Sequence, residues 1–258
     1  MTSPTLLVIA HGSRDPRHAA TVSALTARAR SLAPGLRVVT GFLDFNVPRV
    51  DQVLARLHAE GERHVVAVPL LLTRAFHAKT DIPAVLGEQA ARLPGLIIRQ
   101  ADVLGLGQTP RPEAPLLAAL ERRLAEAGLD PADQAATGVV LAAAGSTDPE
   151  AIAVIGRLAR HWRRTGGWCA VRPAFASASR PTTADAVRAL RADGVRRVAV
   201  APYVIAPGRL PDRILAGARE AGADLVAPVL GDAPELARLL LARYAAAARP
   251  RLRALLAG

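Results

Sequence analysis

The chain of 258 residues contains a single cysteine, Cys169, and few aromatic side chains. One cysteine excludes an internal disulfide and any cysteine-based zinc ribbon or iron–sulfur cluster within the chain. Aromatic residues make up 3% of the sequence but hydrophobic residues make up 51%, so the core must consist mainly of Leu, Val and Ala. Such a core is typical of helices packed on a Val-rich parallel sheet, which favours the α/β class.

The sequence also lacks a long apolar run near its start. The N-terminal segment has no basic region, and its apolar stretch, Thr5–Ala10, ends at a His and a Gly. A secretory signal peptide begins with basic residues, and a membrane span needs about 20 apolar residues. We therefore expect a cytoplasmic protein that does not bind membranes.

Lysine is nearly absent: Lys79 is the only one, and the other positively charged side chains are arginines. The formal charge is +11 and the pI is near 11.4, which could indicate nucleic acid, an anionic membrane surface or a small polyanion as partner. The arginines occur in ones and twos, and no aromatic residues alternate with them to stack on bases. These features disfavour nucleic acid as the partner.

Short apolar runs alternate with longer helical patterns along the first half of the chain. The expected strands are Thr5–Ala10, Leu36–Leu43, His64–Leu72 and Leu96–Gln100. The expected helices begin near Pro16, Pro48, Ile82 and Leu116 and end near Leu32, Ala59, Ala91 and Ala127. Strands that alternate with helices predict parallel pairing in a doubly wound sheet with helices on both faces.

The same pattern then begins again, which is the most informative feature of the sequence. The segment AHGSRDP at 10–16 returns as AAGSTDP at 143–149, a shift of 133 positions, and the same shift pairs Phe42 with Phe175 and Pro48 with Pro181. One offset without gaps aligns three junctions between strand and loop, which indicates two copies of one fold. We predict two tandem domains, residues 1–130 and 131–258.

Three side chains of the first copy follow directly on predicted strands. His11 follows the first strand, Asp44 the second, and His77 lies in the loop after the third. Ligands of open parallel sheets bind beyond the carboxyl ends of the strands. Two imidazoles and a carboxylate at that edge could hold a divalent ion and leave coordination positions open.

Each of these residues also has a purely structural interpretation. A histidine at a strand end can simply be hydrogen-bonded, and Asp44 could cap the next helix. The second copy tests these interpretations, because residues needed for the fold should recur there. The scaffold residues do recur, but the three positions hold, in the same order, Ala144, Ser177 and Leu210. Their joint loss indicates that the three residues of the first copy work as one functional unit.

The remaining candidates are weaker. The other histidines fall in helices or at a strand start and are expected to have surface or packing roles; they are His18, His58, His64 and His161. Cys169 follows Trp168 near a predicted strand and is expected to be buried rather than reactive. No glycine-rich phosphate loop of the P-loop or dinucleotide-binding form is present in the sequence.

Three segments together resemble the sirohydrochlorin chelatase family, the class II chelatases of siroheme and cobalamin biosynthesis. They are HGSRDP at 11–16, FLDFNVP at 42–48 and VPLLLTRAFHAKTDIP at 68–83. The resemblance implies duplicated flavodoxin-like units, of which the second here serves as scaffold and half of the cleft. It implies that His11 and His77 bind the metal and help to remove pyrrole protons, assisted by Asp44. The family's acid at that place is commonly Glu, and Asp44 is shorter by one C–C bond, about 1.5 Å.

The resemblance also implies a substrate, sirohydrochlorin, with eight carboxylates, and a divalent metal ion as second substrate rather than a permanently bound cofactor. Arginine suits bidentate pairing with carboxylates. The expected substrate-binding residues flank the three loops and are Ser13, Arg14, Arg17, Arg49, Arg74 and Lys79.

The leading hypothesis is a sirohydrochlorin ferrochelatase that makes siroheme from Fe²⁺, acting as a monomer whose two halves form an internal pseudo-dimer. A cobaltochelatase of cobalamin synthesis is the alternative within the class, since such ligands accept iron and cobalt alike. The alternatives from other classes are a non-catalytic tetrapyrrole or metal carrier and a nucleic-acid-binding protein.

Overall fold

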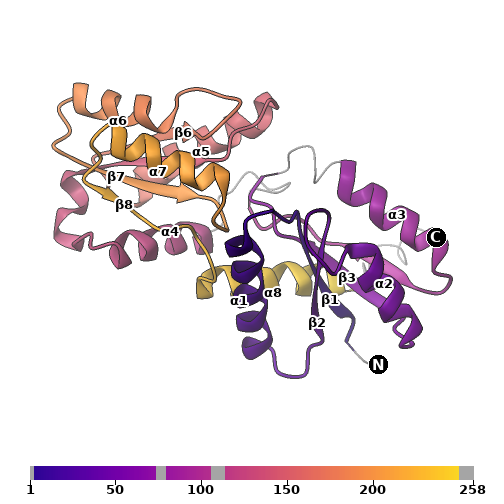
Figure 1. The fold of residues 1–258 in the computed structure, drawn as a ribbon. Coiled ribbons are helices and arrows are strands. Elements are labelled where there is room, and N and C mark those ends of the chain that lie inside the picture. Colours follow the sequence, from indigo (N-terminus) through magenta and orange to yellow (C-terminus); the bar gives the residue numbers. More distant parts are fainter. Residues whose placement is uncertain (1–2, 74–79, 106–113, 250–258) are drawn as a thin grey trace, which may run out of the picture.

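The computed structural model describes residues 3–73, 80–105 and 114–249, which form two lobes, each built on a four-stranded parallel sheet (Figure 1). The strands of the N-terminal lobe, in sheet order, are β2 (Val38–Phe42), β1 (Thr5–Ala10), β3 (His64–Pro69) and β4 (Ile97–Gln100). Those of the C-terminal lobe are β6 (Ala170–Phe175), β5 (Thr137–Ala143), β7 (Arg197–Tyr203) and β8 (Leu225–Val226). The strand order is the same in both lobes, so the predicted duplication of an α/β fold is confirmed.

Helices cover both faces of each sheet, as the alternating pattern predicts. On the outer faces lie α2 (Val50–Ala59), α3 (Ile82–Arg92), α6 (Thr183–Ala192) and α7 (Arg209–Glu220). On the faces toward the middle of the molecule lie α1 (Pro16–Leu32), α4 (Ala114–Glu126), α5 (Pro149–Thr165) and α8 (Pro234–Ala248). Among the described residues, no helix is long and apolar enough to cross a membrane.

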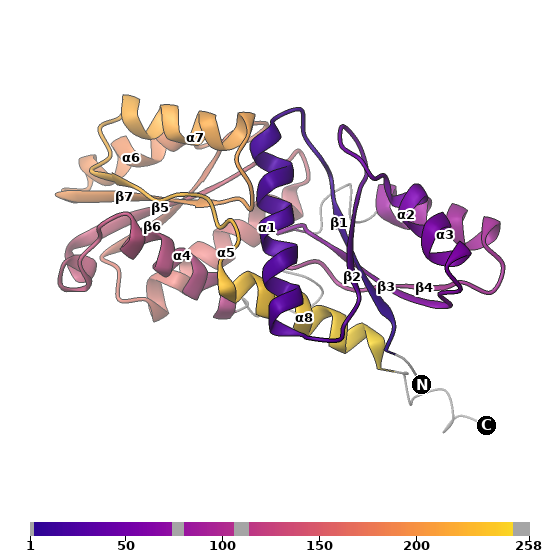
Figure 2. The ribbon, with the colours of Figure 1, turned by 60° about the horizontal axis from the view of Figure 1, so that its bottom comes forward.

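Two helices lie on the lobe opposite to the one that sequence order predicts. Helix α4 follows the first sheet in the chain but packs against β7, whereas α8 follows the second sheet but packs against α1, β3 and β4. Both arrangements are visible in Figures 1 and 2. The predicted boundary near residue 130 therefore separates the two sheets but not the two helices. A short 3-10 helix, Pro131–Ala136, lies at this boundary.

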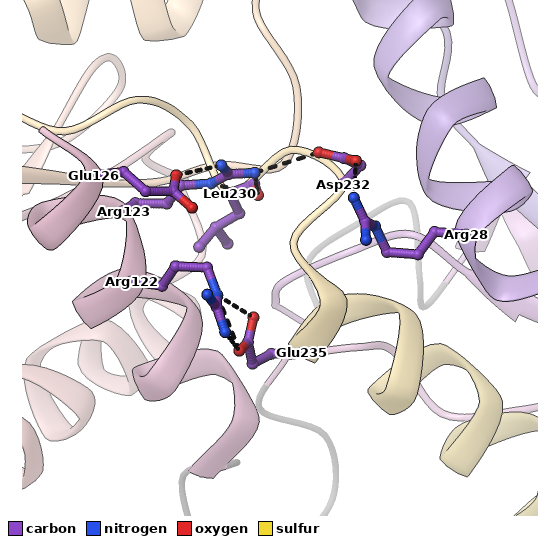
Figure 3. Close-up of polar contacts among 7 residues, drawn as sticks. All are labelled: Arg28, Arg122, Arg123, Glu126, Leu230, Asp232 and Glu235. Carbon is purple, nitrogen blue, oxygen red and sulfur yellow. Dashed lines mark hydrogen bonds and ion pairs between the residues drawn. The ribbon is translucent and has the colours of Figure 1, made fainter. Parts of the chain in front are cut away.

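Polar contacts fix the exchanged helices. On α8, the Tyr244 hydroxyl donates to the Pro4 carbonyl at 2.6 Å, which ties the helix to the start of the N-terminal lobe. Helices α4 and α8 meet through Arg122, whose guanidinium pairs with Glu235 at 2.6 Å (Figure 3). Asp232, just before α8, pairs with Arg28 of α1 at 2.7 Å and so joins the connecting segment to the N-terminal lobe.

The core is one continuous cluster between the sheets, with a smaller cluster under each outer pair of helices. The central cluster contains Leu6 and Val8 of the first sheet as well as Leu141 and Ala201 of the second. Trp162 of α5 is fully buried in it, and its indole Nε1 donates to Glu121 of α4 at 2.9 Å. The lobes thus share their main hydrophobic core.

Some details differ from the sequence-based expectations. The third strand ends at Pro69 rather than Leu72, because the chain turns there: the Leu71 amide donates to the Pro69 carbonyl at 2.9 Å. The second strand starts at Val38 rather than Leu36. Cys169 is exposed, not buried as expected, because the strand begins only at the next residue and the buried neighbour is Trp168.

Candidate active site

The carboxyl ends of the central strands of both sheets border a cavity of about 540 Å³ between the lobes. Its walls come from residues 10–13 after β1, 70–73 after β3, 143–146 after β5 and 203–211 after β7. The cavity lies within the usual size range of sites for small organic ligands. The predicted cleft between the two copies is therefore present at the edge where parallel sheets bind their ligands.

The turn after β1 positions His11 at this cavity. Gly12 has φ +95°, and an added Cβ would lie 1.8 Å from the Asp44 carbonyl oxygen, so only glycine fits. Gly145 repeats this geometry in the second copy, 1.9 Å from the Ser177 carbonyl oxygen. The turn is thus scaffold, as the repeat predicted, and what differs between the copies is the residue before it.

His11 lines the cavity, with its Nδ1 3.3 Å from the Gly12 carbonyl oxygen. With the proton on Nδ1, the lone pair lies on Nε2, the nitrogen that can ligate a metal or accept a proton. Its ring lies 6.1 Å from the Phe45 ring, between centroids, and tilted by 33°. Phe45 is 49% exposed and has φ +61°, so the structure holds an apolar ring at the mouth of the cavity.

Asp44 follows β2 but is not among the residues that line the cavity, and its carboxylate is turned toward its own loop. It accepts a hydrogen bond from the Phe45 amide at 2.8 Å and lies 3.5 Å from the Arg49 guanidinium. The side chain is 55% exposed. In the second copy, Ser177 instead donates to the Ala144 carbonyl at 3.0 Å. A direct role of Asp44 in chemistry stays a prediction.

Ser13 belongs to the scaffold of the loop as well as to the cavity wall. Its amide donates to Asn46 Oδ1 at 2.8 Å, and its Oγ accepts from the Asp15 amide at 3.1 Å. Asp15 in turn caps α1 through the Arg17 amide. The sequence argument missed Asn46, whose place in the second copy is taken by Ser179, 3.4 Å from the Ser146 amide.

The predicted substrate-binding arginines have different partners. Arg17 pairs with Asp15 at 2.6 Å and, across the cleft mouth, with Asp212 of α7 at 2.9 Å. Arg49 pairs with Asp44. Arg14 lies over the Phe45 ring, 5.3 Å from its centroid. Contact of these residues with substrate stays a prediction; the remaining predicted residues Arg74, His77 and Lys79 lie outside the described part of the chain.

The sequence argument missed His18, which it assigned to packing. His18 lines the same cavity as His11, and its Nδ1 is buried without a hydrogen-bond partner. Burial lowers the pKa of His18, and the neighbouring His11 lowers it further, while Asp15 acts in the opposite direction. The imidazole is therefore neutral at pH 7. The signal was its place in the first turn of a helix that starts beside the end of β1.

The second copy lines the cavity with apolar residues where the first copy has predicted ligands. Ala144 and Leu210 both face it. In the ranges 3–73, 80–105 and 114–249, no three His, Cys, Asp or Glu side chains come together as a metal site. The only predicted ligand whose position is described at the cavity is therefore His11.

Comparison with other proteins identifies relatives over nearly the whole chain. The CbiX family matches residues 5–127 and 138–247. A sirohydrochlorin cobaltochelatase of Priestia megaterium is 28% identical over 214 residues, which cover 81% of this chain and 67% of the relative. A sirohydrochlorin ferrochelatase of the same organism is 25% identical over 210 residues, or 81% of this chain and 76% of the relative.

Solved structures agree with the fold. SirB from Bacillus subtilis with Fe³⁺ has a TM-score of 0.81 at 24% identity, covering 95% of this chain and 96% of that one. The sirohydrochlorin chelatase SirB from Bacillus subtilis subspecies spizizenii in complex with cobalt has a TM-score of 0.78 at 22% identity, covering 95% of each chain. The two-lobed architecture is thus shared by proteins whose sequences have diverged widely.

Proposed function

Because this chain belongs to the CbiX family along both of its lobes, we propose that it inserts a divalent metal ion into sirohydrochlorin. The observation that carries the proposal is His11, which lines a cavity between two lobes and is replaced by Ala144 in the second copy. The relatives named as sirohydrochlorin chelatases support the substrate. The metal is a substrate here and leaves with the product.

Insertion of M²⁺ replaces two pyrrole N–H protons, so the reaction needs a metal donor and proton acceptors in one place. We assign His11 and His77 as the ligands that deliver the ion and then receive protons. Few ligands suit this task, because the ion must be surrendered to the four macrocycle nitrogens. We keep Asp44 as the assisting acid, whose negative charge would attract the metal cation toward the site.

His18 adds a second imidazole to the described wall of the cavity. Because burial and the neighbouring His11 lower its pKa, His18 resists protonation and leaves the transferred protons to the other groups of the site. The apolar surroundings, including Leu70, Ile155 and Phe175, fit a macrocycle face and exclude water. The C-terminal lobe thus contributes wall rather than ligands.

We propose Fe²⁺ as the physiological metal and Co²⁺ as the alternative. Relatives with either name match this chain, and imidazole with carboxylate accepts both ions. The sequence has no His-rich tract that would buffer cobalt, which favours iron. A carrier without catalysis is the candidate from another class.

The test is anaerobic insertion of Fe²⁺ or Co²⁺ into sirohydrochlorin, followed by the change in the absorption spectrum. The protein should exceed the uncatalysed rate, and His11→Ala and His77→Ala should each lower its rate by at least about 10²-fold, the scale of losing a positioned proton acceptor. His64→Ala is the matched control, because His64 is exposed at the opposite end of β3. Tight macrocycle binding without acceleration by either metal would establish the carrier instead.

A further inference from the structure

A second cavity, of about 820 Å³, lies at the mouth of the cleft and shares His11, Gly12 and Ser13 with the first. One side is formed by the loop after β1, including Arg14. The other side is formed by α7 of the C-terminal lobe, including Arg209 and Arg213. Positive side chains from both lobes therefore face one opening.

The acids at this opening do not neutralise these arginines. Its two carboxylates, Asp15 and Asp212, both pair with Arg17. Within the part of the chain that the structure describes, no carboxylate pairs with Arg14, Arg209 or Arg213. The mouth thus carries positive charge that the protein leaves unbalanced.

Arg209 and Arg213 do not stabilise helix α7, so helix stability does not explain why they are there. Arg209 and Arg213 are four residues apart on one helix, where like charges repel. They also lie in and next to the first turn, where the helix dipole disfavours positive charge. A bound anion would reduce both the repulsion between the two arginines and their unfavourable interaction with the helix dipole. No carboxylate of the described residues pairs with them to do so.

The internal repeat supports a function for these positions. By the shift of 133 residues, Leu210 takes the place of His77, and Arg209 and Arg213 replace Phe76 and Thr80. The first copy has its basic residues of this loop at Arg74 and Lys79, which the second copy replaces with Pro207 and Asp212. The second copy therefore has two basic side chains at new positions, beside the place where the predicted metal ligand is lost.

We infer that Arg209 and Arg213 of α7, together with Arg14 from the opposite lobe, bind carboxylates of the macrocycle and so form an anion clamp across the cleft mouth. This inference rests on the proposed function. It assigns the two copies different tasks: the N-terminal lobe handles the metal, and the C-terminal lobe holds the charged periphery of the substrate. Guanidinium is suited to this, since it pairs with carboxylate in a bidentate manner.

The test is equilibrium binding of metal-free sirohydrochlorin to the full chain, followed by fluorescence. We expect the double variant Arg209→Ala/Arg213→Ala to raise Kd by at least about tenfold, the effect of one lost charge-assisted contact. The dependence of Kd on salt should also become shallower. Arg219→Ala is the matched control, because Arg219 lies at the far end of the same helix and outside both cavities.

Kinetics give a second readout. In the insertion assay the double variant should raise KM with kcat nearly unchanged, because the contacts exist in ground and transition states alike. Wild-type Kd and KM in the double variant, with sirohydrochlorin bound tightly, would overturn the clamp and leave the proposed function intact. Failure of the unaltered protein to bind sirohydrochlorin at all would overturn the proposed function, and the clamp with it.

Discussion

At the scale of single residues, the sequence argument identified His11 but overlooked His18. His11 follows an apolar run and disappears from the second copy, and both signals are local. His18 looks like any polar residue of a helix. It reaches the cavity because the loop between β1 and α1 is short, which places the first turn of the helix beside the end of the strand.

Sequence patterns also do not show in which direction a side chain points. Asp44 follows its strand as predicted, yet its carboxylate accepts a hydrogen bond from the Phe45 amide and pairs with Arg49. Arg17 was expected to face substrate, and it joins the two lobes through Asp212. The partner of Arg17 lies 195 positions away, which no local pattern contains. The partners of Asp44 are local, but a pattern of residue types does not specify which way its side chain turns.

His18 leads to a prediction about stability and pH. Its pKa in the folded protein is lowered from 6.5, chiefly by burial, so the unfolded chain takes up the proton at higher pH than the folded one. The associated stability is complete above the unfolded pKa, near 6.5, and is lost as the pH falls through the folded pKa. His18→Gln should therefore show a smaller fall in Tm than the wild type between neutral and mildly acidic pH.

Thermal unfolding monitored by circular dichroism at several pH values measures this difference. The same substitution at the exposed His64 serves as the control for the change of side chain. If His18→Gln follows the same curve as the wild type, His18 titrates normally in the folded protein and the burial argument is wrong.

At the scale of helices and strands, the sequence predicted which elements form but not where two of them pack. The alternating pattern gave the strands of the first sheet, and the repeat extended it to the second. Helices α4 and α8 each have an apolar face that fits either sheet, so amphipathicity alone cannot assign them. The contacts that decide, such as that of Tyr244 on α8 with Pro4, join residues 240 positions apart.

The contact between α4 and α8 should contribute measurably to stability. Arg122 forms a bidentate pair with Glu235, whose side chain is only 10% exposed. A double-mutant cycle on this pair should give a favourable coupling free energy larger than that of a fully exposed ion pair. Arg188 and Glu220, which are 56% and 64% exposed, should give a value near zero. Urea unfolding of the single and double alanine variants measures both couplings; equal values would show that burial does not matter here.

At the scale of the whole molecule, the repeat predicted two lobes and the family resemblance implied a cleft between them, and both are present. What the sequence did not reveal is that each lobe is completed by a helix from the other half of the chain. This exchange explains why the lobes share one core. Leu236 and Leu240 of α8, both 0% exposed, belong to the cluster that also contains Leu6 of the first strand.

The exchange changes what is expected of the N-terminal half alone. In the full chain, α8 covers the inner face of the first sheet, while α4 covers the second sheet. A fragment of residues 1–130 retains α4 but lacks α8, so on the inner face of its sheet only α1 remains and the part that α8 covers is exposed. Two copies can solve this by placing α4 of each on the sheet of the other, which recreates the arrangement of the two lobes.

We therefore expect the fragment 1–130 to be a dimer with a mass close to the 27.0 kDa of the full chain, as measured by light scattering. The dimer would carry two copies of His11 and of the loop with His77, so some insertion activity should remain. A shorter fragment, 1–105, lacks α4 and should aggregate, because exposed apolar surface of this size is not tolerated in a soluble monomer. If the fragment 1–130 is instead a stable monomer, α4 can cover the sheet of its own lobe. The exchange of α4 and α8 in the full chain is then one of two packing arrangements of similar free energy and is not required by the fold.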